Sequence, residues 1–284
     1  MVEPPAGGMP VHRDQDPAER PGSAAPLPLA RNPGVEAPSV GEIMAFVLCR
    51  ALRDDDVAIF GAVSLLPLAA CRLAQLTHAP NLTMITGPSG GVNPAADPLV
   101  PSVGDYANLA GEAILDFPTA LGLQAGGRVT VFFAGGLEID AYGNANLLGN
   151  PAVRGPGAAG LPLSATVGRT ILYTSRHDPR TFVPRVAAVT LPGWEPNPAA
   201  GDSGPGRAAG GPVLVVTPLA VCDFAPSGRM RLVSLHSGVS AAAVQAATGF
   251  PLFLPDPVPV TPLPPRPLLR LLRELDRSGL LRQV

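Results

Sequence analysis

Helix-like and strand-like segments alternate from residue 39 onward, and this order limits the folds that the chain can adopt. Ser39 or Gly41 can cap a first helix, and residues 65–76 have the apolar spacing of a second helix. Each helix is followed by a short apolar run, at 57–60 and at 82–85, that is typical of a buried strand. This alternation predicts an α/β fold: an open, mostly parallel sheet with helices on both faces.

The chain divides into three predicted parts. Residues 1–38 contain nine prolines and no aromatic side chain, which predicts a disordered proline-rich leader. Residues 39–250 form the single predicted α/β domain, and residues 251–284 form a proline-rich strap and a C-terminal amphipathic helix. Beyond residue 85 the predicted elements are helices at 113–123, 240–247 and 268–275, strands at 129–134, 170–174, 186–191, 213–216 and 230–235, and a long loop at 140–168.

Charge and composition exclude several classes of function. The net charge of −2 gives no electrostatic footprint for nucleic acid or for an anionic membrane surface. Every Lys or Arg position is arginine, which excludes Schiff-base and phosphate-binding lysines. The widely spaced Cys49, Cys71 and Cys222 predict buried core thiols and no metal site. The sequence shows no signal peptide and no membrane-spanning run, so we expect a cytoplasmic protein.

A glycine-rich loop follows the second predicted strand. Gly87, Pro88, Ser89, Gly90 and Gly91 come where the loops of an α/β sheet line a ligand crevice. Bare backbone can approach a ligand closely at such a place. The loop contains neither an acid nor a base, and its only hydroxyl is that of Ser89. The sequence therefore predicts a binding loop without an obvious catalytic group.

Three ordered motifs resemble the β subunit of family I CoA-transferases, most closely the glutaconate and 3-oxoacid type. The motifs are THAPNLTMITG at 77–87, GGRVTVFFAGGLEIDAYGNANLLG at 126–149 and VSLHSGVSAAAVQAATGF at 233–250. Residues 155–170 and 176–186 match two further segments of the family, and the resemblance covers about residues 40–280. It implies the open α/β sheet, a coenzyme A thioester as substrate with no bound cofactor, and an α subunit of the same fold as partner in a heterodimer or heterotetramer.

The resemblance also implies a catalytic group that this loop does not contain. Transferases of the family carry a loop glutamate that is first acylated and then itself becomes the acyl group of a CoA thioester. Ungapped alignment places Gly87 at that position, and one gap places Pro88 there. Ser89 could be acylated as an ester, but it cannot form a glutamyl-CoA intermediate.

Glu138 is the predicted catalytic residue. It follows the Gly135-Gly136 turn at the end of a predicted strand, where the family usually has glutamine. As an acid or base, Glu138 would face the cleft within reach of loop 87–91; as a structural residue, it would accept hydrogen bonds in place of an amide. Gly135 and Gly136 can present backbone N–H groups to a thioester oxygen as an oxyanion turn, or can form a plain tight turn.

The remaining polar residues of the folded region have plainer interpretations. We expect Glu42 and Glu112 to be solvated charges near helix starts, and Glu195 to lie in a loop. A structural or solvated role is favoured over a catalytic or CoA-binding role for Asp140, Tyr142, Asn144, Asn146, His177, His236, Arg176, Arg180 and Arg185.

Three functions follow from these observations. The first is the β subunit of an enzyme that transfers CoA between carboxylic acids. The second is a hydrolase or hydratase subunit acting on a bulky ring-containing acyl-CoA, with the catalytic glutamate in the α subunit. The third is a non-catalytic subunit that only binds acyl-CoA. All three have acyl-CoA as ligand and an α-like subunit as partner, and none involves nucleic acid or a membrane.

Overall fold

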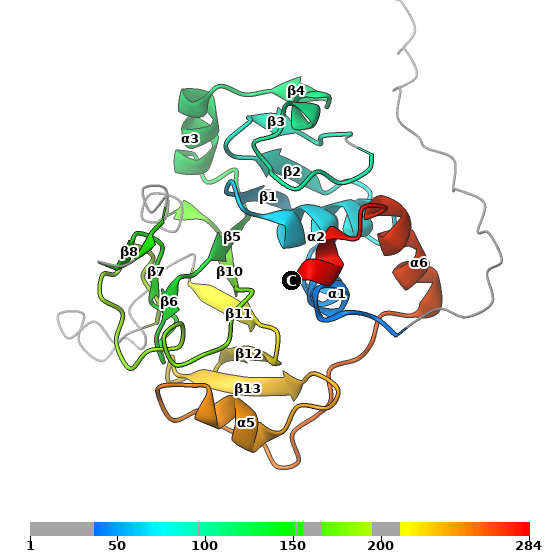
Figure 1. Ribbon diagram of the computed structural model, residues 1–284. Helices are drawn as coiled ribbons and strands as arrows, with labels where there is room; N and C mark the ends of the chain where they lie inside the picture. Colours follow the sequence, from blue (N-terminus) through cyan, green and yellow to red (C-terminus); the bar gives the residue numbers. More distant parts are fainter. Residues whose placement is uncertain (1–36, 96, 151–152, 156–165, 195–210) are drawn as a thin grey trace, which may run out of the picture. The chain divides into compact units, whose positions relative to one another are not determined.

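The computed structural model describes residues 37–95, 97–150, 153–155, 166–194 and 211–284 (Figure 1). Apart from Ala37 and Pro38, the predicted leader lies outside these residues, as does Glu195. The helices are α1 (Val40–Arg50), α2 (Leu65–Gln75), α3 (Phe117–Ala125), α5 (Ala241–Ala246) and α6 (Arg266–Leu275), with 3-10 helices η1 (Tyr106–Leu109) and η2 (Leu280–Gln283). The strands are β1 (Val57–Phe60), β2 (Thr83–Thr86), β3 (Gly91–Val92), β4 (Ala113–Ile114), β5 (Val131–Gly135), β6 (Glu138–Ile139), β7 (Ala145–Asn146), β8 (Gly149–Asn150), β9 (Val153–Arg154), β10 (Arg169–Tyr173), β11 (Pro212–Val216), β12 (Ala220–Phe224) and β13 (Met230–Leu235).

One large sheet organises the domain. Its nine strands have the order β13-β12-β11-β10-β5-β1-β2-β3-β4. The central strands from β11 to β2 run parallel, and antiparallel strands extend the sheet at both ends. Phe60 of β1 pairs with Phe133 of β5 and with Thr86 of β2, so the carboxyl ends of these strands are level. The predicted open, mostly parallel sheet is confirmed.

Alternate residues of the central strands point into two separate apolar cores. Phe60 and Phe133 pack with side chains of α1, α2 and α6 on one face of the sheet. Their neighbours Ile59 and Phe132 pack on the other face with side chains of α5 and of the β6–β7 hairpin. The alternation follows from the two-residue period of a strand. Helices on both faces are thus confirmed, and Figure 1 shows α1, α2 and α6 together on one side.

The predicted helix at 113–123 begins later than expected. Ala113 and Ile114 form β4, which pairs with β3 at the end of the sheet. The helix α3 starts after Asp116, whose carboxylate accepts the amide proton of Thr119 and so caps the helix. A two-residue strand has no detectable periodicity, so the sequence pattern does not separate this apolar run from the helix that follows it.

The predicted strand at 186–191 is wrong. Among the described residues of this segment, Leu191 makes the only ladder contact, an isolated bridge to Ala145. Val186 and Leu191 are buried, so their apolar character serves core packing without a continuous strand. The strands β6 and β12 were not predicted, and the short strands β7 to β9 lie in the segment 140–168 that the sequence predicts as loop.

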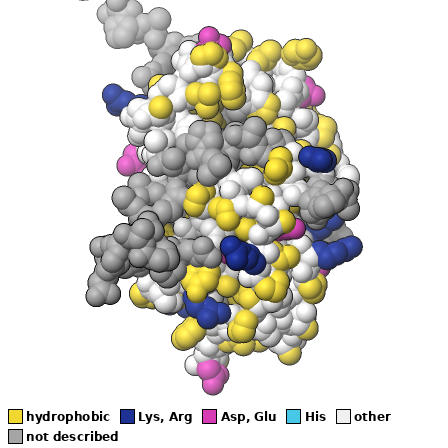
Figure 2. Space-filling view, turned by 90° about the vertical axis from the view of Figure 1, so that its left-hand side faces the viewer, with side chains coloured by type: hydrophobic (Ala, Val, Ile, Leu, Met, Phe, Trp, Pro, Cys, Tyr) yellow, Lys and Arg dark blue, Asp and Glu magenta, His cyan; other side chains and the backbone are white. Residues whose placement is uncertain are grey.

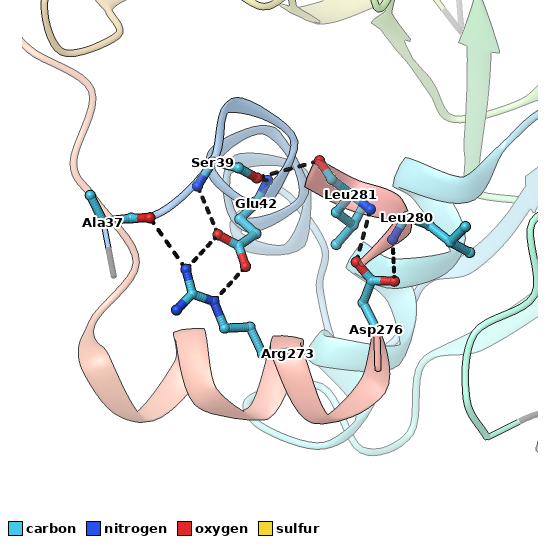
Figure 3. A network of polar contacts seen from close by, with 7 residues as sticks. All are labelled: Ala37, Ser39, Glu42, Arg273, Asp276, Leu280 and Leu281. Carbon is cyan, nitrogen blue, oxygen red and sulfur yellow. Dashed lines mark hydrogen bonds and ion pairs between the residues drawn. The ribbon is translucent and has the colours of Figure 1, made fainter. Parts of the chain in front are cut away.

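Residues near the start and the end of the domain meet in a polar network, which we call the terminal clasp: Ser39, Glu42, Arg273, Asp276 and Leu281 (Figure 3). Ser39 and Glu42 form a capping box at the start of α1. Arg273 of α6 donates to both carboxylate oxygens of Glu42, at 2.6 and 3.0 Å. Asp276 accepts the backbone amide of Leu281, whose carbonyl accepts the Ser39 hydroxyl. The clasp thus joins α1 to α6 and η2.

Glu42 corrects one expectation from the sequence. It is 2% exposed and paired with Arg273, so the prediction of a solvated charge is wrong. Burial raises the pKa of Glu42, but hydrogen bonds from Arg273 and Ser39 outweigh burial and leave the pKa below its usual value. The partner comes from the opposite end of the domain, which a local pattern cannot reveal.

The C-terminal helix and the cysteines agree with the predictions from the sequence. The predicted final helix is α6, and its apolar stripe buries Leu269, Leu272 and Leu275. The preceding segment runs beside β13, with bridges at Phe253 and Val260. The three cysteines are buried and free, as expected.

Candidate functional site

Three loops lie at one edge of the sheet. The chain passes from β1 to β2 on one side and later returns through β5 on the other side of β1. Such a switch point is where open α/β sheets bind ligands, outside the carboxyl ends of the strands. Residues 61–64 follow β1, residues 87–91 follow β2, and the Gly135-Gly136 turn lies at the end of β5. Because β1 separates them, the ends of β2 and β5 lie roughly 10 Å apart. The structure therefore brings the predicted loop and turn to one edge.

Loop 87–91 is the turn of a hairpin between β2 and β3. The Gly90 amide donates to the Thr86 carbonyl at 2.7 Å. The Ser89 hydroxyl lies 2.7 Å from the Thr86 hydroxyl, which donates to the Gly91 carbonyl. Ser89 is therefore tied to the base of its own turn. These contacts favour a structural role for the one hydroxyl of the loop.

The glycines let a neighbouring segment pack closely on this loop. A Cβ on Gly91 would collide with the Asn108 carbonyl, and one on Gly90 would collide with the Leu115 carbonyl. Gly90 also has φ +73°, which side chains other than glycine rarely adopt. Part of the bare backbone is therefore covered by residues 102–117.

The two candidate positions for the missing glutamate differ in the space around them. A Cβ on Gly87 would lie 2.9 Å from the carbonyl oxygen of Phe60, so a side chain there requires the backbone to move. Pro88 is exposed. Of the two positions, Pro88 is the one that can carry a carboxylate without backbone movement.

Tyr173, at the end of β10, links the loops that follow β1 and β5. Its hydroxyl lies 2.8 Å from the Ser64 hydroxyl and donates to the Val63 carbonyl at 3.0 Å. A Cβ on Gly135 would be in van der Waals contact with the Tyr173 ring, at 3.5 Å. Burial raises the pKa of Tyr173 to about 12, so the phenol stays protonated. Tyr173 and Ser64 are not among the predicted site residues, and their only signal in the sequence is a tyrosine that ends a buried strand.

Backbone amides at the Gly135-Gly136 turn already donate hydrogen bonds within the chain. The Gly136 amide donates to the Tyr173 carbonyl over a long 3.3 Å, and the Leu137 amide donates to the Asn146 carbonyl at 3.0 Å. An oxyanion would have to replace the weaker of these bonds to use the Gly136 amide. The oxyanion role of this turn stays a prediction.

Glu138 opens β6 and is 8% exposed. Its Oε2 accepts the side-chain amide of Asn146 and the backbone amide of Ala187, both at 2.8 Å. These bonds tie the β6–β7 hairpin to the segment around Ala187 and support the structural alternative. The reach of Glu138 to loop 87–91 and its catalytic role stay predictions.

The motif after Glu138 folds on itself. Asp140 accepts the backbone amides of Tyr142 and Asn144 and the side-chain amide of Asn144. Asn144 in turn accepts the Gly193 amide at 2.7 Å. These bonds support the preferred structural interpretation of Asp140 and Asn144. The exposed side chains of Arg176, Arg180, Arg185 and Glu112 also agree with expectation.

The half-buried His177 and the buried His236 connect strand ends to α5 and to the strap. The ring of His177 lies 2.8 Å from the Thr217 hydroxyl and 3.0 Å from the Thr248 hydroxyl. Burial lowers the pKa of His177 to about 4, against a smaller rise from the nearby Asp178 charge. His236 bonds the Thr217 carbonyl and the Thr261 hydroxyl, and burial lowers its pKa as well. Both rings are neutral near pH 7, which fits their expected structural role.

No group of three or more His, Cys, Asp or Glu side chains among the described residues could hold a metal ion. None of the helices described is both long and apolar enough to cross a membrane.

An open α/β sheet with glycine-rich loops at the switch point defines a ligand-binding or catalytic subunit. No protein-family model matches the chain. The β subunit of the 3-oxoadipate CoA-transferase of Pseudomonas knackmussii (strain DSM 6978 / CCUG 54928 / LMG 23759 / B13) is 34% identical over 262 residues, covering 85% of this chain and 95% of the relative. The chain thus belongs to the family of CoA-transferase β subunits, and the resemblance seen in the sequence is confirmed.

Other similar proteins are named for different activities. The cholesterol ring-cleaving hydrolase IpdB subunit of Mycobacterium tuberculosis (strain ATCC 25618 / H37Rv) is 28% identical over 238 residues, covering 82% of this chain and 92% of that protein. The crystal structure of the decarboxylase AibA/AibB superposes with a TM-score of 0.74 at 27% identity, covering 86% of this chain and 98% of that one. Proteins similar to this chain therefore include a transferase, a hydrolase and a decarboxylase.

Proposed function

We propose that this chain is the β subunit of a two-subunit enzyme that acts on acyl-CoA thioesters and transfers CoA between carboxylic acids. The observation that carries the proposal is the match along nearly the whole length of a CoA-transferase β subunit, at 34% identity. The relatives are named as subunits, and the AibA/AibB structure pairs two chains, which supports an α-type partner.

The proposed site lies at the carboxyl edge of β1, β2 and β5. Loop 87–91 would contact the acyl-CoA, the Gly135-Gly136 turn would face the thioester oxygen, and Glu138 would act as acid or base. The shared edge of the two loops supports this assignment. A buried carboxylate near such a loop suits proton transfer if it reaches the substrate.

A second candidate is hydrolysis or hydration of a bulky, ring-containing acyl-CoA, with the catalytic glutamate on the α-type partner. The specific observation in its favour is the absence of any carboxylate from loop 87–91. Without one, the chain lacks a loop nucleophile that could be acylated and then converted to a thioester. The similarity to a ring-cleaving hydrolase subunit also supports this second candidate function.

The test uses the complex of the chain with the α-type partner encoded in the same genome. CoA exchange between acyl-CoA and free acids is measured over a panel of acids, and hydration or ring opening is measured with cyclic acyl-CoA esters. CoA exchange without hydration or ring opening supports the transferase, and the reverse supports the second candidate. A well-folded complex that does neither supports a subunit that only binds acyl-CoA.

A loop variant sharpens this test. Pro88→Glu places a carboxylate in the loop at the exposed position, and Gly87→Glu is the matched variant in which the Cβ collides with Phe60. If transfer needs a loop carboxylate, Pro88→Glu should raise the exchange rate, while Gly87→Glu should lose roughly 1–3 kcal/mol of stability. An unchanged exchange rate in a stable Pro88→Glu complex would argue that the loop does not hold the nucleophile.

A further inference from the structure

The candidate site contains a buried pair of hydroxyl groups, on Tyr173 and Ser64. On the face shown in Figure 2, the Arg, Asp and Glu side chains of the described residues lie apart, among apolar and neutral ones. By contrast, Tyr173 is 7% exposed and Ser64 is 2% exposed, and their hydroxyl oxygens lie 2.8 Å apart. A buried polar group needs a partner, so such a contact fixes two segments of the chain relative to each other.

The donors in this contact follow from the chemistry of the groups. The Tyr173 hydroxyl lies 3.0 Å from the Val63 carbonyl oxygen, which can only accept, so the single phenol proton goes to Val63. The Ser64 hydroxyl then donates to the phenol oxygen. Tyr173 is therefore both donor and acceptor, and it holds two consecutive residues of the loop that follows β1.

The local sequence explains why Ser64 is free for this bond. Ser64 is the N-cap residue of α2, and a serine there normally accepts the backbone N–H of the second or third helical residue. The third helical residue is Pro67, which has no N–H. The Ser64 side chain makes no cap bond, so its hydroxyl is available to Tyr173. A local rule is thus given up for a tertiary contact, which is expected at functional sites.

Tyr173 reaches this loop across the end of β5. The sheet order is β10-β5-β1-β2, so β10 and β1 lie roughly 10 Å apart with β5 between them. Tyr173 pairs with Gly135, and a Cβ on Gly135 would lie 3.5 Å from the Tyr173 hydroxyl oxygen. A side chain extending beyond Cβ at this position would meet the phenol, and glycine leaves the phenol room.

Loop 61–64 occupies the middle of the site edge. Because β1 lies between β2 and β5, its loop leaves the sheet between loop 87–91 and the Gly135-Gly136 turn. The Ala62 carbonyl accepts the Val103 amide at 3.1 Å, while Tyr173 holds the two residues that follow. The place of this loop therefore depends on the Tyr173 hydroxyl.

Resting on the proposed function, we propose that Tyr173 and Ser64 form a positioning pair for the acyl-CoA site. The pair holds loop 61–64 in the place that keeps loop 87–91 and the Gly135-Gly136 turn in the arrangement that turnover requires. Neither residue touches the reacting atoms. A displacement of about 1 Å at a supporting position can cost roughly 10²-fold in rate, so the pair should act on kcat. The KM should change less, because acyl-CoA is bound by contacts along its whole length.

The experiment compares two hydroxyl deletions at opposite edges of the sheet. Tyr173→Phe removes the phenol oxygen at the carboxyl edge. Thr130→Val is the matched control at the amino edge, where the Thr130 hydroxyl accepts the Val57 amide and donates to Asp56. Each full-length variant is assayed with excess α-type partner, well below its measured unfolding temperature. Tyr173→Phe should lower kcat at least about 5-fold and change KM for acyl-CoA less than about 2-fold, and Thr130→Val should change both less than about 2-fold.

Variants of Ser64 separate the pair from a role of Tyr173 alone. Ser64→Ala removes one of the two bonds of the phenol, so it should lower kcat less than Tyr173→Phe does. The double variant should have the kcat of Tyr173→Phe, because residues that act through one contact are not additive. Losses that multiply in the double variant would show independent roles and would contradict the pair.

Two results for Tyr173→Phe would overturn the proposal while the turnover of the wild-type complex leaves the proposed function intact. One is a fall in kcat of less than about 5-fold. The other is an equal fall in Thr130→Val, which would show that kcat follows stability and not the place of loop 61–64. A wild-type complex that turns over no acyl-CoA would instead overturn the proposed function, and the positioning pair with it.

Discussion

The terminal clasp and the β6–β7 hairpin each bury a glutamate, but the two carboxylates have different partners. Glu42 of the clasp faces the guanidinium of Arg273, which compensates its charge. Glu138 of the hairpin accepts two amide hydrogen bonds, and among the described residues no ion pair to it is found. The carboxylate of Glu42, paired with arginine, has a structural role, because it joins α1 to α6. The carboxylate of Glu138 has no cationic partner among the described residues, so its proposed role as acid or base is still to be tested.

The largest expected effect is in the clasp. Arg273→Ala leaves the Glu42 carboxylate buried without its cation, which should cost about 3 kcal/mol of unfolding free energy. The matched control is Arg277→Ala on the same side of the domain, whose pair with Asp97 at 3.4 Å is mostly exposed and should contribute at most about 0.5 kcal/mol. Denaturant unfolding measures both. Equal losses would show that the clasp is no stronger than a surface pair.

The second effect separates the two roles of Glu138. Glutamine can accept the bonds from Asn146 and Ala187 with its carbonyl oxygen, so Glu138→Gln should unfold within about 0.5 kcal/mol of wild type. If the carboxylate is catalytic, turnover by the complex should fall roughly 10²-fold. Steady-state rates across pH measure this, since loss of an acid or base also removes a limb of the profile. Near-full activity would assign the chemistry to the partner chain.

The third effect concerns pH and the neutral histidines. His177 has a folded pKa of about 4 against 6.5 when unfolded, so the folded state binds fewer protons in that window. The contribution of His177 to the free energy of unfolding is therefore fully present above pH 6.5 and is lost as the pH drops toward 4. Between pH 7 and pH 5, His177 alone should lower the free energy of unfolding by about 2 kcal/mol. Unfolding midpoints at the two pH values measure it. His177→Asn should reduce this loss, and an identical loss in the variant would contradict the assignment.

The smallest effect is at the site edge. Tyr173→Phe removes the hydroxyl that bonds Ser64 and Val63, which should cost about 1 kcal/mol. Amide hydrogen exchange should speed up in residues 61–64, because the loop after β1 loses this attachment. Tyr106→Phe, at an exposed position, is the control and should change neither quantity. Unchanged exchange at 61–64 in Tyr173→Phe would show that other contacts hold the loop.

Most of the fold could be predicted from the sequence, because its signals are local. The runs at 57–60 and 65–76 match β1 and α2 almost residue by residue, and the leucine stripe of 268–275 matches α6. Elements without a local period were missed or misassigned. Two-residue strands such as β4 have no pattern of their own, and the apolar residues at 186–191 are buried by tertiary contacts without forming a strand.

The candidate site was predicted only in part. The order of the motifs placed loop 87–91 and the Gly135-Gly136 turn at strand ends, and a parallel sheet brings such ends to one edge. The contacts between them were not predictable, since Tyr173 and Ser64 are 109 residues apart in the chain. The same holds for the packing of residues 102–117 on the loop, which explains why Gly90 and Gly91 have no side chain.

The sequence by itself determined the α/β alternation, the helix caps, the buried thiols and the absence of a carboxylate from loop 87–91, because each depends on residues close together in the chain. Tertiary structure alone decided the role of each buried charge. Glu42 and Arg273 are separated by 231 positions, and Glu138 and Ala187 by 49. Whether a carboxylate is solvated, paired or held by amides depends on which distant segment packs against it, and that is set only when the sheet and its helices assemble.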